Sequence, residues 1–202
     1  MKLYYFPGAC SIAPHIVARE AGIPIELEKV DLGSKRTATG EDYNAVNPKG
    51  YVPALRLDDD SVLTEVSALI QYLADRAPAS GLIPAAGTME RYRVLEWIGY
   101  IATEIHKGFG PLWNAKLAPE ARAAAVTALA RRLDLVEQVL ARQPFLNGQA
   151  FTVADAYLFA VASWAPWVKL DMAPWPKLRD YLARIAARPK VQEALVAEGM
   201  SE

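Results

Sequence analysis

The sequence has little cysteine and little histidine, and its hydrophobic runs are short. Cys10 is the single cysteine among 202 residues, and His15 and His106 are the two histidines. One thiol cannot close an internal disulfide, which fits a reducing compartment, and so few ligands predict no metal site. The apolar runs fall short of the roughly 18 residues of a spanning helix, and Lys2 leads into a strand pattern instead of a signal peptide. We therefore expect a cytoplasmic protein.

An excess of charge of one sign is also missing. The 22 basic and 23 acidic residues give a formal net charge of −1, so no broad attraction to nucleic acid or to an anionic membrane follows. Hydrophobic residues make up 52% of the chain, which is enough for one large core or two small ones. We expect a soluble globular protein whose partners are neither nucleic acid nor membrane.

The first part of the chain, residues 1–80, alternates short apolar runs with helical patterns, which is typical of an α/β domain. The predicted strands lie near residues 2–6, 25–30, 53–57 and 61–63. The predicted helices lie near residues 11–21, 40–46 and 65–76.

The second part of the chain has a helical pattern interrupted by prolines. Residues 77–88 concentrate Pro, Gly and small residues, so we place a domain boundary there, with a linker over 81–88. The predicted helices beyond it lie near residues 89–115, 120–142, 153–168, 175–187 and 189–197. The second domain, residues 89–202, is therefore predicted to be an all-helical bundle.

Cys10 lies where the first predicted strand passes into the first predicted helix. Pro7-Gly8-Ala9 precede it, and Ser11 follows. The first N–H groups of a helix carry partial positive charge, so a thiol there can lose its proton near neutral pH and act as a nucleophile. A buried structural cysteine is the alternative, and position alone does not decide between them.

Pro53 and Glu65 point to a ligand of peptide character. A cis Pro53 at the start of a strand would leave the N–H and C=O groups of Val52 free to pair with an extended peptide, although an ordinary edge-strand proline gives the same pattern. Glu65 lies near the start of the next helix, where N–H groups bind carboxylates and its side chain can bind an ammonium. The N–H groups and the Glu65 side chain together suit the carboxylate and the ammonium of an amino acid. The alternative is that Glu65 only complements the helix dipole.

Three other polar positions have different interpretations. His106 lies off the apolar stripe of its helix and could face the first domain, where a histidine can activate a thiol. His15 follows Pro14 inside the first helix, and a structural role is favoured. Thr152-Val153-Ala154-Asp155 has the form of a capping box, so Asp155 is interpreted as a folding device at the start of a buried central helix.

Taken together, these motifs resemble the cytosolic glutathione transferases, in particular their bacterial beta class. The resemblance covers essentially the whole chain, and it rests on Cys10-Ser11, the Pro53 segment, Glu65, His106-Lys107 and the helical second domain. It implies a thioredoxin-like domain followed by a helical domain, and a homodimer.

The resemblance also implies where glutathione, the co-substrate, would bind. The tripeptide would lie extended along Val52 and Pro53, with its γ-glutamyl end at Glu65 and its glycine carboxylate near Lys35. Cys10 would stand beside the glutathione sulfur, where a mixed disulfide can form. His106, Ser11 and Lys107 would support the thiolate.

Two positions depart from the family pattern. Val66 follows Glu65 where the family usually has Ser or Gly, so its backbone N–H, aided by Ser67, must serve the glutamyl end. Gly99 stands where beta-class relatives often have an Asn that reaches across the dimer. Thr103 and Glu104 are the remaining candidates for a contact from the partner subunit.

The implied activity is the conjugation of reduced glutathione to small hydrophobic electrophiles in detoxification, together with glutathione-dependent thiol–disulfide exchange through Cys10. A glutaredoxin-like reductase and a noncatalytic carrier of apolar ligands are the alternatives. The combination of Cys10, Lys35, Glu65 and His106 argues against a carrier. The electrophile is expected against aromatic side chains of the second domain, for which the candidates are Phe109, Trp113, Trp164 and Trp167.

Overall fold

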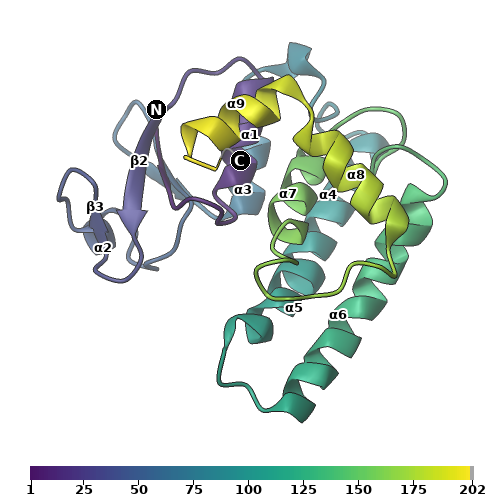
Figure 1. Ribbon diagram of the computed structural model, residues 1–202. Coiled ribbons are helices and arrows are strands. Elements are labelled where there is room, and N and C mark those ends of the chain that lie inside the picture. The colour runs from purple at the N-terminus through teal and green to yellow at the C-terminus, as the bar shows by residue number, and fades with distance from the viewer. Residues whose placement is uncertain (201–202) are drawn as a thin grey trace.

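A computed structural model describes residues 1–200, in which a five-stranded sheet is followed by a set of packed helices (Figure 1). The strand order is β3-β2-β1-β4-β5. The strands are β1 (Lys2–Tyr5), β2 (Glu26–Asp31), β3 (Arg36–Thr37), β4 (Ala54–Arg56) and β5 (Val62–Thr64). β1 pairs in parallel with β2 and antiparallel with β4, and β4 pairs antiparallel with β5, so the sheet is mixed.

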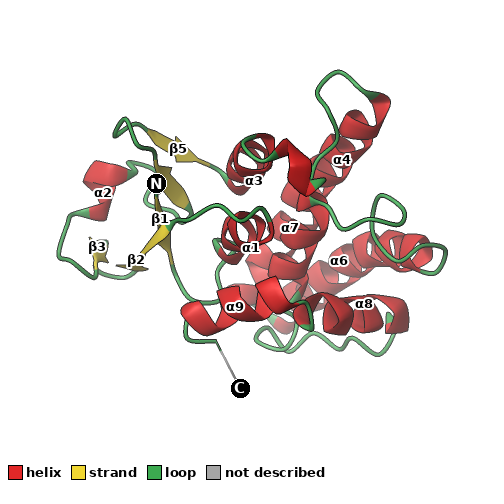
Figure 2. Ribbon diagram, turned by 90° about the horizontal axis from the view of Figure 1, so that it is seen from above, coloured by secondary structure: helices red, strands yellow, loops and turns green. Residues whose placement is uncertain are grey.

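Helices cover both faces of this sheet. The parallel pair β1–β2 needs a crossover, which α1 (Ile12–Glu20) supplies, and α3 (Val66–Asp75) packs beside α1. On the opposite face, Tyr43 of α2 (Tyr43–Val46) packs with Tyr4 and Val30 in a separate apolar cluster. This is the thioredoxin-like arrangement that the resemblance implied. Figure 2 shows α1 and α3 between the sheet and most helices of the second part of the chain.

The second part of the chain is helical, as predicted. Its helices are α4 (Met89–Tyr100), a π-helical segment (Ile101–His106), α5 (Lys107–Phe109), a short 3₁₀ turn (Gly110–Trp113), α6 (Pro119–Leu140), α7 (Val153–Ala162), α8 (Pro176–Ala186) and α9 (Pro189–Ala197). Every residue of α7 is buried, so α7 is the central helix that its apolar sequence predicted.

The two parts of the chain share one large apolar core. α7 packs on α1, and the C-terminal helix α9 returns to pack on α1 as well, as Figure 1 shows in yellow and purple. Residues 81–88 join the two parts without helix or strand, after a short 3₁₀ turn (Pro78–Ser80), and the carbonyl of Leu82 accepts from Val153 N–H at 3.0 Å. This bond ties the linker to the first residue of α7.

Some predicted boundaries are wrong for local reasons. The predicted helix over 153–168 ends at Ala162 and is followed by turns. Pro166 has no N–H to donate to the carbonyl of Ala162, four residues earlier, and its ring would clash with that carbonyl in a continued helix. The predicted helix over 89–115 changes to π-helical geometry at Ile101 and ends in a 3₁₀ turn at Trp113. The two-residue strand β3 was not predicted. Within residues 1–200, no helix combines the length and apolar character needed to cross a bilayer.

Candidate active site

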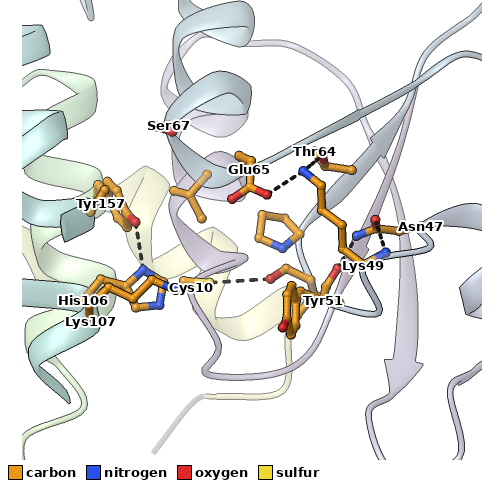
Figure 3. Close-up of a pocket in the computed structure, with 14 residues that line it drawn as sticks. Cys10, Asn47, Lys49, Tyr51, Thr64, Glu65, Ser67, His106, Lys107 and Tyr157 are labelled. Carbon is orange, nitrogen blue, oxygen red and sulfur yellow. Dashed lines mark hydrogen bonds and ion pairs between the residues drawn. The ribbon is translucent and has the colours of Figure 1, made fainter. Parts of the chain in front are cut away.

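A cavity of about 280 Å³ lies where the two parts of the chain meet (Figure 3). Its walls come from the turn before α1, the loop before β4, the start of α3, the π-helical segment with α5, and α7. The lining residues that sequence analysis singled out are Cys10, Val52, Pro53, Glu65, Val66, Ser67, His106 and Lys107. Folding therefore brings together side chains that are far apart in the sequence.

Cys10 lies in a turn just ahead of α1, which begins at Ile12. Its side chain is buried, and the thiol donates to the carbonyl of Val52 with Sγ and O separated by 3.6 Å. Burial raises the pKa of Cys10 from its ordinary 9.0 to about 12, and the opposing effects of its own backbone N–H and of Lys107 are smaller. The helix start, which by itself would favour a thiolate near neutral pH, is outweighed by desolvation, so the thiol stays protonated at that pH.

Ser11 holds the turn that carries Cys10 instead of facing the cavity. It is fully buried, and its hydroxyl bonds to both the N–H and the C=O of Phe6 at 3.2 Å. On the other side of the turn, the carbonyl of Gly8 accepts a hydrogen bond from Trp164 Nε1 at 2.8 Å. The position of Cys10 therefore depends on contacts from both parts of the chain.

The Val52–Pro53 peptide bond is cis, as the sequence analysis proposed. The ladder of β4 begins at Ala54, so Val52 lies on the cavity wall beyond the sheet. The loop before it is fixed by the carbonyl of Tyr51, which accepts from the Tyr43 hydroxyl at 2.6 Å and from Asn47 Nδ2 at 2.7 Å. Lys35 supports the same loop, since its Nζ donates to the carbonyl of Gly50 at 2.9 Å.

Glu65 immediately precedes α3 and has a φ of 74°. A side chain in this left-handed region costs roughly 1–2 kcal/mol, and such strain persists where the surroundings determine the backbone. The Glu65 carboxylate lies 2.7 Å from Lys49 Nζ, which also donates to the Thr64 hydroxyl at 2.9 Å. Glu65 is therefore exposed to the cavity in a fixed backbone geometry, with a cation beside it.

His106 ends the π-helical segment and is held by a residue that sequence analysis missed. Its Nδ1 lies 2.8 Å from the hydroxyl of Tyr157, a buried residue of α7. A buried hydroxyl proton needs an acceptor, so we assign Tyr157 as the donor and His106 Nδ1 as the acceptor. The remaining ring proton is then on Nε2. Burial, followed by repulsion from Lys107, lowers the pKa of His106 to about 4, so the ring is neutral at pH 7.

A second cavity of about 380 Å³ adjoins the first and has an aromatic lining. Cys10 and Val52 line both cavities, and Lys35 lines the second one only. Three of the four predicted aromatic residues are here, namely Trp113, Trp164 and Trp167. Phe109 is fully buried instead and packs edge-on against Trp164, with ring centroids 5.8 Å apart, so the prediction that it faces an electrophile is wrong in this structure.

Thr103 and Glu104 do not line either of these cavities. The Thr103 hydroxyl donates to the carbonyl of Gly99 at 3.0 Å, and Glu104 pairs with Arg132 of α6 at 3.0 Å. Both face α6 and line a separate depression there. Their contact with glutathione from a partner subunit stays a prediction.

Two polar residues assigned to folding have the expected surroundings. Asp155 is buried and accepts from the N–H groups of Thr152 and Leu146 and from the hydroxyl of Tyr181, at 2.8–2.9 Å, which includes the capping-box contact. His15 is buried and bonds to Glu198 at 2.9 Å. Among residues 1–200, no three His, Cys, Asp or Glu side chains are grouped so that they could hold a metal ion.

Comparison with known proteins gives consistent matches over the chain. The family model "Glutathione S-transferase, N-terminal domain" matches residues 9–76, and "Glutathione S-transferase, C-terminal domain" matches residues 100–189. Glutathione S-transferase GstA of Escherichia coli O157:H7 is 48% identical, covering 99% of this chain and all of that protein.

Solved structures match over both domains. The sphingomonad glutathione S-transferase complexed with glutathione is 46% identical, with a TM-score of 0.95 and complete coverage of both chains. The bacterial beta-class glutathione S-transferase of Sphingomonas chungbukensis is 44% identical, also with a TM-score of 0.95 and complete coverage of both chains.

Proposed function

This chain belongs to the glutathione S-transferase family and is similar to its bacterial beta class, and from that premise we propose that it conjugates reduced glutathione, through its sulfur, to hydrophobic electrophiles. One observation carries the proposal. Cys10 and Val52 form part of the wall of both the polar cavity and the aromatic cavity. A sulfur atom held at Cys10 therefore meets a polar peptide site on one side and an apolar site on the other.

Glutathione fits the polar cavity in one orientation. Its peptide groups pair with Val52, its γ-glutamyl head lies at Glu65, and its cysteine sulfur lies between Cys10 and His106. Its glycine end then points toward the loop that Lys35 supports. The extended tripeptide follows the cavity wall from the start of α3 to that loop.

The residues around the sulfur stabilise it as a thiolate. The Nε2–H of His106 donates to the sulfur, and Tyr157 holds the ring in the tautomer that leaves this proton in place. The protonated Cys10 thiol turns from the Val52 carbonyl, which pairs with the glutathione peptide instead, and donates to the sulfur from the other side. The Lys107 ammonium adds positive charge at the cavity wall. The glutathione thiol proton passes to solvent, and the thiolate then attacks the electrophilic carbon as the leaving group departs with its electron pair.

The aromatic cavity positions the electrophile. Trp164 is almost fully buried, whereas Trp113 and Trp167 are 48% and 53% exposed, so two of the three indole rings can lie against a bound molecule. The Trp113 and Trp164 rings meet edge to face, with centroids 5.6 Å apart. Such a wall favours planar, apolar substrates.

The direct test is glutathione-dependent turnover with a panel of aryl halides, alkyl halides and epoxides. We expect saturable conjugation with at least one aryl halide, and a Trp113→Ala variant with a raised KM for the electrophile. The matched control is Trp97→Ala, because Trp97 packs on Tyr100 and lines neither cavity, so this change should leave the KM for the electrophile unaltered. The absence of conjugation across the whole panel would overturn the proposal.

Thiol–disulfide exchange is the second candidate function, because the sole thiol of the chain lines the cavity proposed for glutathione. In the exchange, the Cys10 thiolate attacks a mixed disulfide between glutathione and a substrate thiol, takes over the glutathionyl group and releases the substrate as a thiolate. The thiolate of a second glutathione then attacks the Cys10–glutathione disulfide, which releases the Cys10 thiolate and oxidised glutathione as the product. The raised pKa of Cys10 makes this route slow near neutral pH, so we rank it below conjugation.

Intact mass after treatment with oxidised glutathione tests the second route. We expect slow addition of one glutathionyl group, which Cys10→Ser abolishes. An unmodified protein after prolonged treatment would exclude exchange through Cys10. If Cys10→Ala kept full conjugation and full glutathione affinity, the role of Cys10 beside the sulfur would be wrong, and His106 would carry the chemistry.

A homodimer completes the proposal. Met89 and Tyr92 of α4 are large hydrophobic residues that are 65% and 56% exposed, which supports a covered surface along that helix. Light scattering on the purified protein measures the mass directly. A monomer at micromolar concentration would contradict the dimer and remove Thr103 and Glu104 from the predicted site.

A further inference from the structure

Glu65, at the end of the polar cavity assigned to the γ-glutamyl head, forms an ion pair with Lys49. Lys49 lies in the loop between α2 and β4, and its Nζ is 2.7 Å from Glu65 Oε1 and 2.9 Å from Thr64 Oγ1. Both Lys49 and Glu65 line the cavity, and Figure 3 shows the ammonium reaching across to the carboxylate. A cation and an anion thus stand side by side at the end assigned to the γ-glutamyl head.

This pair can accept a ligand at little cost. The Lys49 and Glu65 side chains are 50% and 61% exposed, and an ion pair with that exposure contributes only about 0–1 kcal/mol. Lys49 can therefore shift on its flexible stem while Glu65 stays fixed by its backbone at the start of α3. The arrangement is polar enough to bind a charged group and loose enough to open for it.

We propose that Lys49 binds the α-carboxylate of the γ-glutamyl residue while Glu65 binds its α-ammonium, an inference that rests on the proposed binding of glutathione. An amino acid head group carries one negative and one positive group on the same carbon. When this head group lies against the Lys49–Glu65 pair, its charges alternate with those of the protein, so that each charge has a neighbour of opposite sign. Lys49 is then a specificity-determining residue for a zwitterionic head group.

The first residue of α3 provides no side-chain hydroxyl for the α-carboxylate. Val66 is buried and offers only its backbone N–H, which leaves Ser67 as the hydroxyl beside it on the cavity wall. The other two cations of the site lie elsewhere. Lys107 is on the His106 side, and Lys35 donates to the carbonyl of Gly50 and lines the other cavity. Lys49 is therefore the lysine placed to bind the α-carboxylate.

A different role for Lys49 has the opposite consequence. If its ammonium mainly occupies the position of the ligand's ammonium on Glu65, Lys49 is an internal competitor, and its removal strengthens binding. If it only shapes the loop, its removal weakens every ligand equally. The sign and the ligand dependence of the effect thus separate the three roles.

The experiment is calorimetric titration of wild type, Lys49→Met and Lys49→Arg with two ligands. One is reduced glutathione, and the other is γ-aminobutyryl-cysteinylglycine, which lacks only the α-carboxylate. Lys190→Met is the matched control, because Lys190 forms an equally short exposed pair with Glu193 at 2.7 Å, outside the residues lining the cavity. Thermal melts confirm that each variant is folded.

We expect Lys49→Met to weaken glutathione binding about tenfold and to leave binding of the analogue unchanged. Lys49→Arg should keep most of the affinity, and Lys190→Met should match wild type. Tighter glutathione binding by Lys49→Met, equal losses for both ligands, or no change would each overturn the inference. If wild type itself fails to bind glutathione, the proposed function fails first, which distinguishes the two failures.

Discussion

The raised pKa of Cys10 makes a prediction that a simple labelling experiment can test. Cys10 is the only cysteine in the chain, so the intact mass after reaction with iodoacetamide reports this thiol alone. Only the thiolate reacts, and the rate therefore follows the ionised fraction. The perturbation is pH, raised in steps from about 7 to about 10.

The magnitude follows from burial. With a pKa of about 12 in place of the ordinary 9.0, about one thiol in ten thousand is ionised at pH 8, compared with about one in ten for an exposed cysteine. We expect labelling about a thousandfold slower than for an exposed thiol, rising about tenfold for each pH unit throughout the range. Steric shielding by Val52 lowers the rate without changing this slope, so the slope is the diagnostic quantity.

The control is the same protein unfolded in guanidinium chloride, where the thiol is exposed and its rate levels off above its ordinary pKa. Tryptophan fluorescence at each pH confirms that the other sample is folded. A rate in the folded protein that levels off below about pH 8 would refute the reasoning, because it would mean that the thiolate is stable at neutral pH.

Three further predictions concern the residues that hold the site. Tyr157→Phe removes the hydroxyl that donates to His106 Nδ1, so kcat for conjugation should fall about tenfold with KM for glutathione nearly unchanged, and an unchanged kcat would exclude the tautomer assignment. Asp155→Ala removes the carboxylate that accepts from four buried donors, so urea unfolding should show a loss of about 3 kcal/mol, and a loss below about 1 kcal/mol would contradict its structural role. Gly8→Ala would place a Cβ against the ring of Trp167 at a φ of 74°, so unfolding should show a loss of about 2 kcal/mol. Trp167→Ala in the same chain should recover the part due to the clash but not the backbone strain, and a double-mutant cycle without coupling would rule out that contact.

The sequence predicted the architecture well where the spacing of apolar residues agrees with the prolines and glycines that end helices and strands. The alternation of short strands and helices up to Asp75, and the proline-interrupted helices from Met89, correspond to the observed elements. β3 was missed because two residues carry no periodic signal. The π-helical turn over Ile101–His106 was missed because one extra residue in a turn hardly alters the spacing of apolar side chains.

The candidate site could be predicted only in part. Cys10 and Glu65 stood out because each lies at the start of a predicted helix, and His106 because it lies off the apolar stripe of its helix. The structure brings the three side chains to one cavity. Tyr157 lay within a run of apolar residues and was interpreted as core. The signal that could have found it is its hydroxyl, which needs a partner when the ring is buried.

Two properties of the site depend on contacts that sequence spacing does not contain. The pKa of Cys10 is set by burial among segments distant in the chain, which opposes the local effect of the helix start. Nothing in the sequence around Lys49 separates it from other loop lysines, and only the packing of the loop before β4 against the start of α3 brings it to Glu65. In both cases tertiary structure, and not the local sequence, decides the chemistry of the residue.

The most direct test of the central claim is a crystal structure of the protein with reduced glutathione bound. The account predicts the tripeptide extended along Val52, its sulfur in contact with Cys10 and its γ-glutamyl head at Glu65. Glutathione bound with its sulfur away from Cys10, or in a place other than this cavity, would contradict it.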